Sequence, residues 1–144
     1  MNTATATIND MRHTFDYINR LTKSTGDLVI EQTATSPFIR YNKQFRTLTI
    51  IGESYMEHSR SFYHPVFVKI YDDLLTHGHA KVELNFTSFC PKTVKMIFEL
   101  LGNLRHYKRL AKDVEIVWKT NSNNEMRELG ISLAELFELE IEIE

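Results

Sequence analysis

Two adjacent hydroxyl residues, Thr87 and Ser88, stand where a strand pattern gives way to a helix pattern. Residues 81–86 alternate polar and apolar side chains, which is typical of a half-buried strand. Pro91 suits the first position of a helix, because its ring fixes φ and its missing N–H has no partner to lose there. The hydroxyls are therefore expected beside the free N–H groups of a helix start, a place that favours a phosphate attached to either oxygen. The alternative is that both residues only end the strand and cap the helix.

Other polar residues give weaker indications of chemistry. Glu53, Glu57 and His58 lie close enough in the sequence to form an acid–base group, although a solvated helix start has the same composition. Cys90 precedes the expected helix, whose N-terminus would lower the pKa of the thiol, but a buried inert cysteine fits as well. The sequence contains no glycine-rich phosphate loop, zinc-protease motif or nucleophile elbow.

Composition excludes several classes of protein. The 144 residues suit one domain, and 17 basic against 19 acidic side chains give a net charge of −2, which does not predict a nucleic-acid surface. A single cysteine excludes an internal disulfide, and His77 and His79 supply two of the three or four ligands that a metal site needs. We therefore expect no metal and no other cofactor. The absence of a long apolar run or a signal peptide predicts a cytoplasmic protein without membrane association.

The chain divides into an N-terminal extension, residues 1–26, and a main domain, residues 27–144. Within the extension, residues 9–22 predict a short amphipathic helix, because apolar side chains recur at helical spacing at Met11, Phe15, Ile18 and Leu21. This helix would pack on its own domain or on a partner.

The main domain shows strands and helices in the order βββαβαβαβ, which predicts an α/β domain with a mixed sheet and its two long helices on one face. The expected strands are 27–34, 37–41, 46–51, 80–86, 114–118 and 138–143, and the long helices are 56–76 and 91–110. Pro65 predicts that the helix over residues 56–76 either starts near His64 or has a first turn that is kinked there. The helix over residues 91–110 shows an apolar face at positions 94, 97, 98, 101 and 104. Asn124 would cap a shorter helix over residues 125–129 that Gly130 interrupts or ends, with residues 131–137 continuing it.

Five features in this order resemble the SiaC family of bacterial regulatory phosphoproteins, whose fold is similar to STAS domains. They are the segment Gly52–Tyr55, Pro65 inside a Phe-rich helix, the strand running into hydroxyls before Lys92, the strand Val114–Trp118 and the segment Glu128–Gly130. The resemblance covers about residues 27–143. It implies a STAS-like single domain preceded by the N-terminal helix.

The resemblance also implies a phosphorylation site. In the family the acceptor lies four residues before a Lys that opens a helix, so alignment on Lys92 without a gap places it at Ser88. If one residue is inserted after Asn85, the acceptor is Thr87 instead. The sequence departs from the family pattern at Met56 and His58. It also departs at Phe89, Cys90 and Pro91, which replace small hydroxyl residues, and in an Asn-rich loop over residues 121–124 in place of an acidic one. The implied partner-binding residues are Glu53, Ser54, Tyr55, Thr87, Ser88 and Lys92.

Members of the family are switched by a dedicated Ser/Thr kinase and a metal-dependent Ser/Thr phosphatase. The unphosphorylated form binds a diguanylate cyclase and raises cyclic-di-GMP output, which promotes biofilm formation. The resemblance therefore implies a non-enzymatic regulator. Two alternatives remain: a small enzyme that uses Glu53, Glu57, His58 or Cys90, and a structural interaction module that assembles through its edge strands, including as a homo-oligomer.

Overall fold

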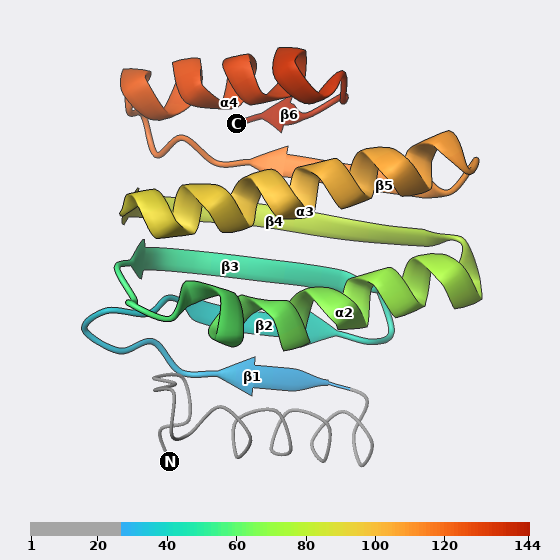
Figure 1. Cartoon of the computed structure of the whole chain (residues 1–144), viewed down its shortest axis with the longest axis horizontal. Coiled ribbons are helices and arrows are strands. Elements are labelled where there is room, and N and C mark those ends of the chain that lie inside the picture. The colour runs from blue at the N-terminus through green and yellow to red at the C-terminus, as the bar shows by residue number, and fades with distance from the viewer. Residues whose placement is uncertain (1–26) are drawn as a thin grey trace.

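The computed structural model describes residues 27–144, so the helix expected over residues 9–22 lies outside this range. Six strands form one sheet in sequence order: β1 (Leu28–Ile30), β2 (Phe38–Asn42), β3 (Thr47–Ser54), β4 (His79–Phe89), β5 (Asp113–Trp118) and β6 (Glu142–Ile143) (Figure 1). β1, β2 and β3 pair antiparallel, whereas β3 to β6 pair parallel. The mixed sheet is confirmed, and so is the pairing of the strands expected over residues 80–86 and 114–118.

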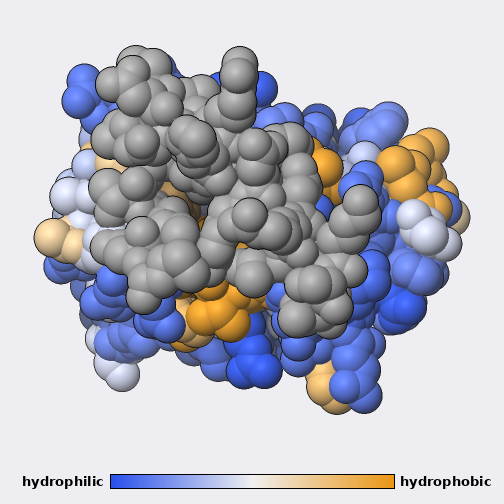
Figure 2. All heavy atoms as spheres, turned by 90° about the horizontal axis from the view of Figure 1, so that it is seen from below, coloured by the Kyte–Doolittle hydropathy of each residue, from blue (hydrophilic) through white to orange (hydrophobic). Residues whose placement is uncertain are grey.

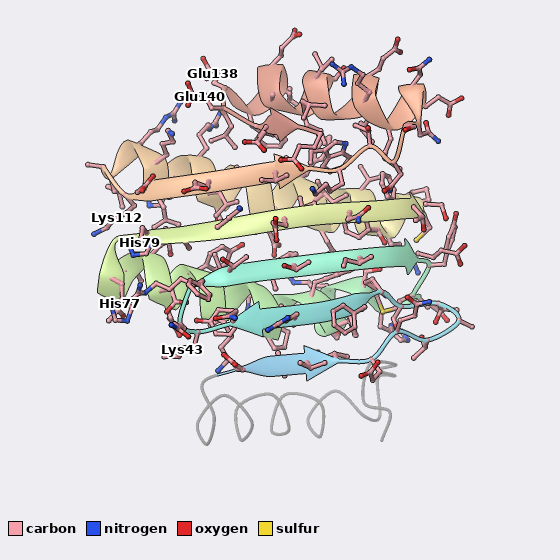
Figure 3. The ribbon with its side chains drawn as sticks, turned by 180° about the vertical axis from the view of Figure 1, so that it is seen from behind. Lys43, His77, His79, Lys112, Glu138 and Glu140 are labelled. Carbon is pink, nitrogen blue, oxygen red and sulfur yellow. The ribbon has the colours of Figure 1, made fainter. Side chains whose placement is uncertain are left out.

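Three helices connect the parallel strands and lie on one face of the sheet. They are α2 (Ser59–His77), α3 (Pro91–Arg109) and α4 (Asn124–Phe137). Each connection leads to the next strand in the same direction, and right-handed crossovers in one direction put every helix on the same side. Figure 1 shows this covered face, and Figure 3 shows the opposite face, where the strands lie in front of the helices. The two long helices therefore share a face, as predicted.

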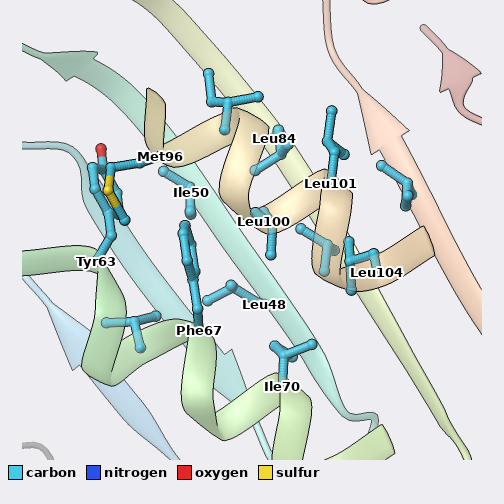
Figure 4. Close-up of a cluster of buried hydrophobic side chains, with 14 of the residues drawn as sticks. Leu48, Ile50, Tyr63, Phe67, Ile70, Leu84, Met96, Leu100, Leu101 and Leu104 are labelled. Carbon is cyan, nitrogen blue, oxygen red and sulfur yellow. The ribbon is translucent and has the colours of Figure 1, made fainter. Parts of the chain in front are cut away.

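The core lies between this face of the sheet and the helices. Alternate residues of β3 and β4 point into it, and they meet the apolar stripes of α2 and α3 (Figure 4). The labelled side chains are buried: Leu48, Ile50, Tyr63, Phe67, Ile70, Leu84, Met96, Leu100, Leu101 and Leu104. Alternation in the strands and the 3.6-residue period in the helices account for this arrangement.

α2 is one continuous helix that begins at Ser59 and contains Pro65. The prediction of a start near His64 was therefore wrong. Gly78 ends α2 with φ of 83°, a left-handed conformation that glycine adopts without a steric penalty, and its N–H donates to the Leu74 carbonyl.

The apolar face of α3 differs from the expected one. Its buried residues are Thr93, Met96, Ile97, Leu100, Leu101 and Leu104, so positions 94 and 98 do not belong to it. Phe98 is 41% exposed and packs edge-to-face on Phe137 of α4 at a ring-centre distance of 5.4 Å. The reason is tertiary: α4 packs beside α3, and Phe98 belongs to that helix–helix contact.

Three expectations about the C-terminal region are corrected. The helix cap is Asn123, whose Oδ1 accepts from the Met126 N–H at 3.0 Å, and not Asn124. α4 runs without interruption through Gly130, which is buried against Trp118. The last strand is only Glu142–Ile143, because α4 extends to Phe137 and residues 138–141 lead back to the sheet.

Gly130 and Gly102 form a matched pair for testing this packing. A Cβ atom at Gly130 would lie 2.5 Å from Trp118 Cδ1, whereas one at Gly102 would have its nearest neighbour, Phe137 Cε1, at 3.8 Å. We expect Gly130→Ala to lower the free energy of unfolding by about 1–3 kcal/mol through overpacking. Gly102→Ala should leave it unchanged or raise it by up to ~1 kcal/mol, because alanine favours a helix. Urea unfolding of both variants measures the difference, and equal stabilities would contradict the close packing of α4 on Trp118.

Candidate functional site

Thr87 and Ser88 lie inside β4, which continues to Phe89, three residues beyond the predicted end. A bulge marks this part of the strand: Phe86 pairs with Gly52, Ser88 pairs with Glu53, and Thr87 has no partner in β3. Paired residues of neighbouring strands point to the same face of a sheet. Glu53 is exposed, between two buried neighbours that face the helices, so Ser88 and Glu53 lie side by side on the uncovered face.

Both hydroxyls are accessible. Thr87 is exposed and Ser88 is partly exposed. Neither caps α3, because the residue at that position is Cys90, so the interpretation of the pair as helix caps was wrong. The predicted strand–helix junction is therefore present, with its hydroxyls two and three residues before the helix cap.

A buried network of three hydroxyls fixes the geometry beneath this junction. Ser54 Oγ lies 2.6 Å from Tyr63 Oη and 2.6 Å from Thr93 Oγ1. The Thr93 hydroxyl donates to the Ser54 carbonyl at 3.0 Å, so Ser54 Oγ donates to Thr93 and accepts from Tyr63. The Cys90 N–H donates to the same carbonyl at 3.0 Å. The network thus joins the end of β3 to α2 and to the first turn of α3.

Burial has two consequences for this network. It raises the pKa of Tyr63 well above its ordinary range, so the phenol stays neutral and can donate to Ser54. It also excludes Ser54 as a contact residue, because the side chain is 0% exposed. The expectation that Ser54 binds a partner directly is therefore corrected: it positions the elements around the junction.

The other residues expected to bind a partner are at the surface. Tyr55 is 47% exposed, and its backbone N–H donates to the Thr35 carbonyl at 2.8 Å. Lys92 is exposed, and its Nζ donates to the Glu57 carbonyl at 3.1 Å. Glu53 and Tyr55 thus lie at the carboxyl end of β3, whereas Lys92 reaches toward Glu57 on the helix side.

The acid–base group considered from the sequence is not assembled. Glu53 lies on the uncovered face, whereas Glu57 and His58 line a groove of about 340 Å³ between the first turns of α2 and α3, on the helix side. Arg60 forms an ion pair with Glu99 in the same groove. Within residues 27–144, no three His, Cys, Asp or Glu side chains are grouped to hold a metal ion.

Cys90 is a further reactive side chain of the junction, beside the two hydroxyls. Partial burial raises the pKa of the thiol, but the N–H and hydroxyl of Thr93 and the N–H of Lys92 outweigh it, so the net pKa lies below that of an ordinary cysteine. The sulfur lies 3.8 Å from Thr93 Oγ1. The first turn of α3 therefore favours the thiolate form of this side chain.

Sequence reasoning missed two sets of residues at the junction: the buried Thr93 and Tyr63, and Asn121 in the loop after β5. Thr93 and Tyr63 carried no signal, because a threonine in a first helical turn and a tyrosine in an apolar stripe are both common. Asn121 Nδ2 donates to Asn85 Oδ1 at 2.7 Å and so ties the loop after β5 to β4. The Asn-rich composition of that loop was the available signal, because asparagine tolerates positive φ and the first two residues of the loop adopt it.

Comparison with known proteins extends this description. Residues 30–144 match the model of the family described as SiaC family regulatory phosphoprotein. Apo-SiaC from Pseudomonas aeruginosa superposes with a TM-score of 0.74 at 21% identity, over 82% of this chain and 98% of that one. The same score and identity hold for diguanylate cyclase SiaD in complex with its activator SiaC from P. aeruginosa, over 81% and 97% of the chains. No match was found among curated proteins. In the part of the chain that the structure describes, no helix has the length and hydropathy to cross a membrane.

The buried network yields a stability prediction. Ser54→Ala should lower the free energy of unfolding by about 1–3 kcal/mol, because the Tyr63 hydroxyl loses its acceptor in a buried place. The control is Thr87→Ala, an exposed hydroxyl, whose effect should stay within about 0.5 kcal/mol. Chemical denaturation separates the two variants, and a harmless Ser54→Ala would show that the network does not hold the three elements together.

The lowered pKa of Cys90 yields a pH prediction. Since only the thiolate reacts with iodoacetamide, alkylation of the folded protein should reach its half-maximal rate at a lower pH than that of the urea-unfolded chain. Thr93→Val removes one stabilising hydroxyl and should move the profile of the folded protein to higher pH. Intact mass follows the reaction at this residue alone, because the chain has a single cysteine. Coinciding profiles of the folded and unfolded chains would refute the effect.

Proposed function

Because the chain belongs to the SiaC family of regulatory phosphoproteins, we propose that it is a non-enzymatic signalling protein switched by reversible phosphorylation at the start of α3. The observation that carries the proposal is the accessible hydroxyl pair Thr87–Ser88, held by a bulge at the carboxyl end of β4. A dedicated Ser/Thr kinase adds the phosphate, and a metal-dependent Ser/Thr phosphatase removes it. Such a switch operates in the cytoplasm.

Two acceptors are compatible with the geometry. Ser88 is placed by alignment on Lys92 without a gap, and it lies beside Glu53 on the uncovered face. Thr87 is placed by the alignment with one inserted residue, and it occupies the bulge, which is itself one extra residue in β4 relative to β3. We rank Ser88 first, and Thr87 is the alternative that the same experiment decides.

The phosphate would act mainly by repulsion. It adds a charge of about −1.5 to −2 at neutral pH, and on Ser88 that charge would lie next to the Glu53 carboxylate of the paired strand. At the start of α3, Pro91 has no N–H, and the Thr93 and Val94 N–H groups donate to the Cys90 carbonyl at 3.0 and 3.3 Å, so few free N–H groups remain there to bind the phosphate. Modification therefore raises the negative potential of the uncovered face around the carboxyl ends of β3 and β4.

The unphosphorylated protein is the form that binds and activates a partner enzyme, which we propose to be a diguanylate cyclase controlling cyclic-di-GMP signalling and biofilm formation. The support is the family and the structural likeness to SiaC in its complex with the cyclase SiaD. Glu53 and Tyr55 present an acid and an aromatic ring at the end of β3, and Lys92 presents a cation in the first turn of α3, beside the groove that Glu57 lines. The partner surface therefore consists of these three side chains with Thr87 and Ser88.

Phosphorylation by the cognate kinase tests the acceptor. We expect Ser88→Ala to abolish the added phosphate mass, and Thr87→Ala to retain it; the opposite result assigns Thr87. Intact-mass spectrometry of both variants and of the double variant gives the readout. If the double variant still takes up phosphate, the site lies elsewhere and the proposal fails.

Partner binding tests the direction of the switch. Ser88→Ala should bind the cyclase as tightly as the unmodified protein does. Ser88→Asp should bind more weakly than the unmodified protein but more tightly than the phosphorylated one, because a carboxylate carries less charge than a phosphate. Calorimetric titration compares the unmodified protein, the phosphorylated protein and the two variants. Tighter binding of the phosphorylated protein would reverse the proposed sign.

A further inference from the structure

The edge strand β1 is buried more completely than its place in the sheet explains. Leu28 and Ile30 point to the helix side of the sheet, because they pair with Tyr41 and Ile39 of the core, and each is 1% exposed. Figure 1 shows that α2 lies over β2 and β3, while β1 lies beyond the edge of that helix. Side chains at the rim of a sheet stay exposed on their outer side unless another segment covers them.

The flank of α2 above β1 is buried as well. Arg60 and His64 pair with Glu99 of α3, which identifies the side of α2 that faces α3. By helical periodicity, Phe62 and Pro65 lie on the flank that faces away from α3, and both are buried. Val66 and Asp73 continue this flank, and Asp73 accepts a hydrogen bond from Tyr41 of β2. Apart from Asp73, the buried side chains on the outer flank of α2 and on the helix side of β1 are therefore apolar, and we call this region the β1–α2 valley.

We propose that residues 9–22 of the same chain occupy the β1–α2 valley as an amphipathic helix. The apolar stripe of this segment matches the valley in character, since Met11, Phe15 and Ile18 recur at spacings of four and three residues. The valley consists of side chains of the same kind: Leu28, Ile30, Phe62, Pro65 and Val66.

The length of the connecting chain favours this occupant over a second molecule. Residues 23–26 separate the segment from Asp27, and so short a link spans on the order of 15 Å when extended. The segment is thus held at the edge of the sheet where the valley lies, at a high effective concentration. Seen from the β1 side, the described surface is mostly hydrophilic, with a few apolar groups in its central part and at one end (Figure 2).

The comparisons indicate that the segment is an addition to the family domain. The family model begins at residue 30, and apo-SiaC from P. aeruginosa is matched over 98% of its length by 82% of this chain. In our proposal the added helix braces α2, which also carries Tyr63 of the buried hydroxyl network. The extension therefore contributes to holding the elements around the phosphorylation junction, whether or not phosphorylation occurs there.

The test uses the full chain with a matched pair of substitutions. Phe15→Asp puts a charge into the apolar stripe, whereas His13→Asp puts the same side chain on the opposite side of the same helix. We expect Phe15→Asp to speed hydrogen–deuterium exchange across residues 28–30 and the first turns of α2, with little change in β4 and β5. Its melting temperature should fall by roughly 5–10 °C, and His13→Asp should match the wild type in both measurements.

A milder variant keeps the test decisive if Phe15→Asp does not fold. Phe15→Ala combined with Ile30→Ala should destabilise the protein by less than the sum of the two single changes, because both side chains belong to one contact. Unchanged exchange in β1 for Phe15→Asp, or strict additivity in the double variant, would overturn the proposal. A dimeric wild type that Phe15→Asp converts to a monomer would also overturn it, since the segment would then bind a second copy.

Discussion

The hydrogen-bonded group of Ser54, Tyr63 and Thr93 is the interaction on which the rest of the site depends. It lies where the carboxyl end of β3 meets α2 and the first turn of α3, and every member is buried and satisfied. A buried hydroxyl without a partner is costly, so these three side chains have one favourable arrangement. That arrangement sets the position of Cys90 and, through it, the direction in which the chain leaves β4.

A sheet covered on one side suits a protein that is recognised by others. The parallel connections place α2, α3 and α4 on one face, so within residues 27–144 the other face keeps polar side chains in contact with solvent. Parallel strands also bring their carboxyl ends to a common edge, where Glu53 and the hydroxyl pair meet. The bulge at Thr87 belongs to this edge: it leaves one residue of β4 unpaired and sets Ser88 beside Glu53. A charge added at this edge would change the surface that a partner meets without disturbing the core.

Two close contacts hold the neighbouring elements in place. Gly130 lets α4 approach the indole of Trp118, whose Nε1 donates to the Met126 carbonyl at 2.8 Å. At the other end of the sheet, Tyr41 donates to Asp73 of α2 in a buried place, and burial together with this carboxylate raises the pKa of the phenol far above its ordinary range. The strands next to the two edges of the sheet, β2 and β5, are therefore anchored to helices by a hydrogen bond as well as by apolar contact.

The sequence by itself determined the order of the elements and the mixed sheet, because alternation, helical spacing and Pro91 are local signals. It placed the hydroxyl pair at a strand–helix junction, but it did not show that the pair lies inside β4. It also indicated the family, which the match over residues 30–144 confirms. Only the tertiary structure decided the rest. Ser54 is a buried positioning residue because Tyr63 and Thr93, 9 and 39 residues away, supply its partners. Phe98 left the core face because α4 packs beside α3, and Gly130 continues a helix because Trp118 occupies the space of a side chain. The extension of β4 past Phe86 depends on pairing with β3, a contact between residues far apart in the chain that no local pattern records.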